Sequence, residues 1–118
     1  MFESDTQKAI DIELSRADQA RLAGNEGMAR VCARRAAGIA VRAYFQQQHM
    51  EFSDPSAFTL LTRLMQLDST PPDIKSIADN LLTRVNPNYE LPTPTDLTAQ
   101  AKGLIGWVVE QLEGDRLD

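Results

Sequence analysis

Residues 27–48 read GMARVCARRAAGIAVRAYFQQQ, and this stretch decides the fold. Together with Asn25 as its cap it offers about 23 residues without a proline, enough for one helix roughly 35 Å long. Small residues, including Cys32, recur on more than one face of that helix, so neighbouring helices can approach it closely from several sides. We therefore predict a buried central helix, whose larger core members are Val31, Ile39, Tyr44 and Phe45.

One amphipathic helix is predicted before this stretch, over about residues 5–23. Ser4 and Gln7 have the spacing of a capping box, and a narrow apolar stripe follows them. Gly24 supplies a residue that tolerates the left-handed conformation in which helices commonly end. This helix should pack on one side only.

Three more helices are predicted after it, and their start signals are Asp54-Pro55, Thr70-Pro71 and the pair Thr93 and Asp96. They should end near Asp68, Arg84 and Gly114. Residues 85–94 (VNPNYELPTP) hold three prolines and predict a stiff exposed loop. No stretch alternates long enough for a strand. The sequence thus predicts an all-α fold, a single antiparallel up-and-down bundle of four to five helices, forming one domain over 1–118 with a core at about 5–113.

Charge is distributed unevenly along this chain. Its net charge is −5, which argues against a general nucleic-acid coat or a binder of acidic membranes, since phosphates demand a cationic face. Residues 26–49 nevertheless hold four arginines and one glutamate, a local charge of +3 that leaves −8 for the rest. The central helix is therefore a basic island in an acidic protein.

The numbers of cysteines and histidines and the length of the apolar runs exclude several kinds of site and of protein. Cys32 and His49 are the only residues of their types, so no intramolecular disulfide and no metal site of known spacing is expected. No run approaches the roughly 18 apolar residues of a membrane span, and the first residues do not resemble a signal segment. We expect a cytoplasmic protein that needs no metal or cofactor.

In their order, these segments resemble the HEPN family, helical domains named for higher eukaryotes, prokaryotes and proposed nucleotide binding. The resemblance covers about residues 5–113 and rests on three short motifs. They are Arg21-Leu22-Ala23-Gly24-Asn25, the central Ala36-Ala37-Gly38-Ile39-Ala40-Val41-Arg42-Ala43-Tyr44, and Thr83-Arg84-Val85-Asn86-Pro87, which precedes the last amphipathic helix.

The resemblance to HEPN ribonucleases implies an arginine four to six residues before a histidine, with two copies meeting to cut RNA without metal. Arg84 stands in the matching region, but Asn88, Tyr89 and Glu90 occupy the positions where the histidine is needed. Cleavage at a ribose hydroxyl is helped by a group that titrates near neutral pH, and a phenol titrates near ~10. We therefore assign no catalytic residue and favour a non-catalytic member of the family.

Six residues are candidate ligand contacts, each with a simpler alternative. A phosphate or nucleotide contact is the functional reading of Arg84, Asn86, Asn88, Tyr89, Arg35 and Arg42. Arg84 could instead favour a helix dipole, and the asparagines and tyrosine could serve only as turn and packing residues. The central arginines could pair with acids such as Glu13, Asp18 or Glu110.

Three function classes follow. The first is a HEPN-like binding module for nucleotide or RNA phosphate, or for a nucleotidyltransferase partner protein. The second is a metal-independent endoribonuclease of a toxin-antitoxin or defence system, and the third is a structural adaptor. Trp107 lies off the apolar stripe of the last helix, which predicts a homodimer seam along that helix.

Overall fold

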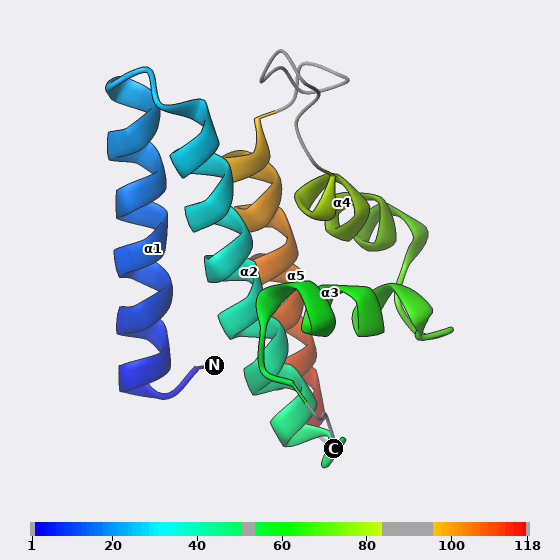
Figure 1. Ribbon diagram of the computed structural model, residues 1–118. Coiled ribbons are helices and arrows are strands. Elements are labelled where there is room, and N and C mark those ends of the chain that lie inside the picture. The colour runs from blue at the N-terminus through cyan, green and yellow to red at the C-terminus, as the bar shows by residue number, and fades with distance from the viewer. Residues whose placement is uncertain (1, 51–53, 84–95, 118) are drawn as a thin grey trace.

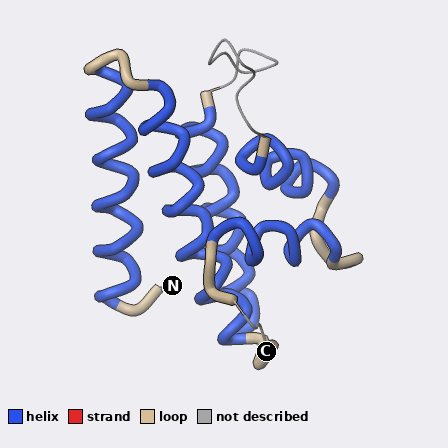
Figure 2. The backbone as a smooth tube through the Cα atoms, viewed as in Figure 1, coloured by secondary structure: helices blue, strands red, loops and turns tan. Residues whose placement is uncertain are grey.

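The computed structural model describes residues 2–50, 54–83 and 96–117, with side chains described as far as residue 114. Within these ranges the chain forms helices and no strand (Figure 2). The helices are α1 (Ser4–Leu22), α2 (Glu26–Gln47), α3 (Ala57–Gln66), α4 (Pro72–Leu82) and α5 (Leu97–Leu117). The predicted all-α class is confirmed, and the five helices pack into one bundle.

Helix α2 is the axis of this bundle and packs against all four other helices (Figure 1). Helices α1 and α2 form an antiparallel pair. Helix α5 runs in the same direction as α2, because Asp96 at its start lies beside Arg21 near the first turn of α2, while Leu112 near its end accepts a hydrogen bond from Gln47. Helices α3 and α4 form a hairpin that crosses the long helices on the side away from α1.

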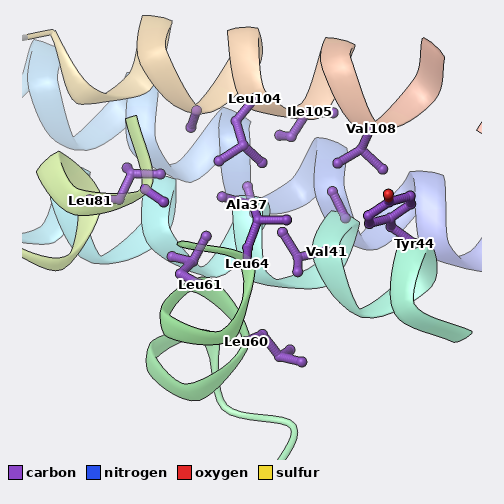
Figure 3. Close-up of a cluster of buried hydrophobic side chains, with 14 of the residues drawn as sticks. Ala37, Val41, Tyr44, Leu60, Leu61, Leu64, Leu81, Leu104, Ile105 and Val108 are labelled. Atoms are coloured by element: carbon purple, nitrogen blue, oxygen red, sulfur yellow. The ribbon is translucent and has the colours of Figure 1, made fainter. Parts of the chain in front are cut away.

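The core lies where α2 faces α3, α4 and α5. Ala37, Val41 and Tyr44 project from α2 into a cluster of larger side chains from the three other helices (Figure 3). Those fully buried in this cluster are Leu60, Leu61, Leu64, Leu81, Leu104 and Val108. The predicted central helix is thus confirmed, although Val31 and Ile39, expected in the core, are only half-buried.

Local chemistry ends the first two helices in the same way. Gly24 has φ +78°, its N–H bonds to Arg21 O, and the next N–H bonds to Ala20 O. His49 follows α2 with φ +56°, and its N–H bonds to Gln46 O while the following N–H bonds to Phe45 O. Both are Schellman motifs, of which the sequence indicated only the first.

Two predicted helix starts are confirmed by the hydrogen bonds of their capping side chains. Asn25 Oδ1 accepts from Met28 N at 3.0 Å, and Asp96 Oδ1 accepts from Ala99 N at 3.0 Å. Each satisfies an N–H that has no partner within its own helix.

The other predicted starts are wrong by one or two residues. Helix α1 begins at Ser4 itself, with Glu3 in the capping position and no side-chain cap. Ser56, not Asp54, caps α3, and Asp54 instead accepts from Ser56 N and Thr59 Oγ1.

The predicted start of α4 and the predicted end of α5 are also wrong, each for a local reason. Pro71 occupies the capping position of α4 and Pro72 its first turn, because the Thr70 hydroxyl donates to Leu64 O and closes α3 instead. Helix α5 continues through Gly114 to Leu117, since a glycine does not by itself end a helix.

Candidate functional site

The four arginines of α2 divide between two faces of the helix. Arg30 Nη1 donates to Thr83 O at 3.0 Å, and Arg34 Nε donates to Leu81 O at 2.8 Å. Both carbonyls lie at the C-terminal end of α4, where helix carbonyls lack partners and the helix dipole favours a cation. Arg30 and Arg34 therefore hold α4 against α2.

Arg35 and Arg42, two turns apart, face α1 and the start of α3. They line one pocket of about 220 Å³. The other lining residues are Glu13, Gly38, Ile39, Pro55 and Ala57. Both arginines are exposed, and neither makes a hydrogen bond or ion pair with any residue in the described ranges. Two guanidinium groups thus border one pocket with their donors available.

Glu13 is the acid of this pocket, and its carboxylate is engaged on the α1 side. Its Oε1 accepts from Arg16 Nη1 at 3.0 Å, and its side chain is only 12% exposed. Its Oε2 is buried without a hydrogen-bond partner among the described residues. The carboxylate also lies near Cys32, whose thiol pKa is raised by burial first and by this neighbouring negative charge second. Glu13 therefore does not pair with Arg35 or Arg42.

A second hollow, of about 390 Å³, adjoins the first along the seam between α1 and α2. Ile39 and Arg42 line both hollows. The remaining residues of the second hollow are Asp5, Thr6, Ala9, Ala43 and Gln46. The two hollows therefore adjoin at Ile39 and Arg42.

The outcome for the six predicted contacts is uneven. Arg35 and Arg42, which lie two turns apart on one face of α2, both line one pocket. Arg84, Asn86, Asn88 and Tyr89 lie outside the described residues, as do Thr93 and the predicted loop. Sequence reasoning did not place Pro55, Asp5 or Gln46 at the site, because only the packing of α1 and α3 on α2 brings them there.

The alternative pairing of the arginines with acids is not what the ion pairs show. Glu13 pairs with Arg16, and Asp18 Oδ2 lies 3.8 Å from Lys102 Nζ. The basic face formed by Arg35 and Arg42 is therefore not covered by these two acids.

Three further residues, Cys32, His49 and Trp107, contribute to packing or to a turn. Cys32 is buried, as expected of a structural thiol, and His49 forms the turn after α2. Trp107 is half-buried and packs edge-on against Tyr44, with ring centroids 5.5 Å apart. Four large apolar side chains elsewhere are more exposed than Trp107, namely Leu22, Phe58, Ile12 and Met28.

The described part of the chain offers neither a membrane span nor a metal site. None of the described helices is both long and apolar enough to cross a bilayer. Among the same residues, no group of three His, Cys, Asp or Glu side chains is placed to hold a metal ion.

No protein-family model, curated protein or solved structure matches this chain.

Proposed function

We propose that this protein is a non-catalytic binding module of HEPN type that holds the phosphate of a nucleotide or RNA between Arg35 and Arg42. The single observation that carries the proposal is that both side chains line one pocket and are not engaged by another described residue. Two unengaged arginines that line one pocket can bind the same anionic ligand.

Guanidinium chemistry supports phosphate as that anion. An arginine presents a planar set of donors that can bind two phosphate oxygens at once, and charge-assisted hydrogen bonds are roughly twice as strong as neutral ones. Arg35 and Arg42 are about 10.5 Å apart along the helix axis at 1.5 Å per residue, so their long side chains can converge on one phosphate from two sides.

The side chains at the pocket favour binding of RNA or nucleotide without cleavage. Among the described residues, the titratable groups that line it are two arginines and Glu13, whose Oε1 is paired with Arg16. The chain's single imidazole belongs to His49, which does not line the pocket. The described lining of the pocket therefore offers no imidazole beside the proposed phosphate.

A binding titration tests the proposal. Inorganic phosphate, adenosine monophosphate and a short labelled RNA would be titrated into wild type, the double variant Arg35→Ala/Arg42→Ala, and Arg63→Ala, an exposed arginine of α3 outside the pocket. We expect the double variant to lose measurable binding and Arg63→Ala to retain it. Equal binding by all three proteins, or no binding at all, would refute the proposal.

A cleavage assay separates the module from the endoribonuclease. Total RNA incubated with the protein in EDTA should stay intact over hours. Fragmentation that disappears in Arg84→Ala would instead establish the metal-independent enzyme.

Self-association and a nucleotidyltransferase partner are proposals that rest on the family resemblance. Light scattering at micromolar concentration tests the first, with a dimer expected. Affinity purification of the native complex, followed by mass spectrometry, tests the second. An adaptor is the alternative if the protein binds neither phosphate nor RNA.

A further inference from the structure

We infer that the ligand is a small phosphate monoester whose organic part carries hydroxyl or amino groups and lies in the hollow beside the phosphate pocket. This inference rests on the proposed function, because it takes Arg35 and Arg42 as the phosphate contacts. It adds the chemical class of the remainder of the ligand and the residues that would recognise it.

The first argument is that the two hollows lie side by side and share two lining residues. The pocket at Arg35 measures about 220 Å³, whereas small-molecule sites typically occupy roughly 300–1,000 Å³. The adjoining hollow adds about 390 Å³ and shares Ile39 and Arg42 with the first. A phosphate at Arg42 would therefore stand at the junction, with space beside it for the group to which it is esterified.

The lining of the second hollow indicates what that group must offer. The polar residues that line this hollow are Asp5 and Gln46, which are exposed, and Thr6, which is half-buried. An ionised carboxylate can only accept hydrogen bonds, so Asp5 requires a donor such as a hydroxyl or amino group. Ala9, Ile39 and Ala43 supply an apolar surface against which the carbon skeleton of a sugar or a ring can lie.

The carboxylates of Asp5 and Glu3 disfavour a ligand with more than one phosphate. A third hollow continues the seam, and Glu3 lines it together with Thr6 and Gln46. A ligand with a second phosphate in either of these hollows would bring like charges together at Asp5 or Glu3, which is unfavourable at short range. At the other end, two arginines against the single carboxylate of Glu13 suit one phosphate, while hydrogen-bond donors suit the Asp5 end.

Isothermal titration calorimetry can test this with ligands that differ only in their organic part. Ribose 5-phosphate and adenosine monophosphate are compared with inorganic phosphate and pyrophosphate. We expect at least one monoester to bind about tenfold more tightly than inorganic phosphate, the gain typical of a hydrogen bond to a charged group, and pyrophosphate to gain nothing.

Asp5→Asn is the decisive variant, and Asp79→Asn, an exposed aspartate of α4 outside both hollows, is its control. We expect Asp5→Asn to remove most of the monoester's advantage while leaving the affinity for inorganic phosphate unchanged, and Asp79→Asn to change neither. Circular dichroism melts of both variants show whether the fold is retained.

The outcomes separate the inference from the proposal beneath it. If phosphate binds through Arg35 and Arg42 but the monoesters bind no more tightly, or keep their advantage in Asp5→Asn, only this inference is wrong. If no phosphate compound binds, or if binding persists in Arg35→Ala/Arg42→Ala, the proposed function fails and this inference fails with it.

Discussion

Gly38 of α2 and Ala57 of α3 are packed so closely that a Cβ added to Gly38 would lie 2.6 Å from Ala57 Cβ and 2.8 Å from Ala57 Cα. Both residues line the pocket between Arg35 and Arg42. The contact that joins two helices of the bundle therefore also forms a wall of the candidate site. A change in the spacing of these helices should alter both stability and binding.

Gly38→Ala should destabilise the fold even though alanine is the better helix former. The added methyl group would clash with backbone and side-chain atoms of Ala57, and overpacking of this kind costs about 1–3 kcal/mol, more than the roughly 1 kcal/mol that alanine gains over glycine in a helix. Urea unfolding followed by circular dichroism measures the difference. We expect a net loss of up to about 2 kcal/mol in the free energy of unfolding.

Gly106→Ala is the matched control, because a Cβ at Gly106 in the middle of α5 meets nothing within 4 Å. It should stabilise the protein by about 0.5–1 kcal/mol. If both variants are stabilised, the close approach of α2 and α3 at Gly38 does not hold.

His49→Gly should stabilise the protein. His49 has φ +56°, a left-handed conformation that a residue with a Cβ adopts at a cost, and glycine adopts it readily. Allowing for the greater freedom of glycine in the unfolded chain, we expect a gain of about 0.5–1 kcal/mol, measured by urea unfolding. Gln48→Gly, one position earlier and at φ −80°, should give no such gain; a loss of stability in His49→Gly would contradict the prediction.

Local signals allowed much of this fold to be predicted. Asn25 and Asp96 act as caps because their short side chains reach an N–H three residues on, and such chemistry depends on sequence neighbours alone. Asp54 was wrongly predicted as the cap of α3 for a related reason. It accepts from Ser56 and Thr59 much as a cap does, while Ser56 holds the capping position.

The candidate site was predictable only in part, because it depends on which helix covers which face of α2. Arg35 and Arg42 are two turns apart in the sequence, a spacing that puts both on one helix face. No local pattern indicated that Arg30 and Arg34 would bind the carbonyl ends of α4. Nor did any local pattern indicate that Asp5 would lie beside Arg42. Those relationships arise from contacts between residues far apart in the sequence.

Acid should weaken the junction between α1 and α5. The pKa of Asp96 is lowered, first by the hydrogen bond from Ala99 N and then by Arg21, whose Nη1 lies 2.7 Å from its carboxylate. A lowered pKa in the folded state gives stability that is present above the unfolded value, about 3.9, and is lost as the pH falls through the folded value. The wild-type free energy of unfolding should therefore fall as the pH drops below about 4.

Asp96→Asn should make that fall shallower, because asparagine also caps a helix but does not titrate. Urea unfolding of both proteins at several pH values between about 3 and 6 gives the comparison. Some pH dependence should remain in the variant, since hydrogen bonds from Ser56 and Thr59 also lower the pKa of Asp54. Identical pH profiles would show that Asp96 does not contribute.

The adjacent residues Arg34 and Arg35 should respond in opposite ways to the same substitution. Arg34→Ala removes a half-buried hydrogen bond of 2.8 Å to Leu81 O at the end of α4, and hydrogen bonds from charged groups contribute about 1.5–3 kcal/mol. Arg35→Ala removes an exposed side chain without a described partner, so its free energy of unfolding should stay within about 0.5 kcal/mol of wild type. Phosphate affinity should show the reverse, falling in Arg35→Ala and remaining close to wild type in Arg34→Ala under conditions where both are folded. Urea unfolding and calorimetric titration of the two variants measure both quantities. Equal losses of stability would mean that the two faces of α2 do not have separate roles.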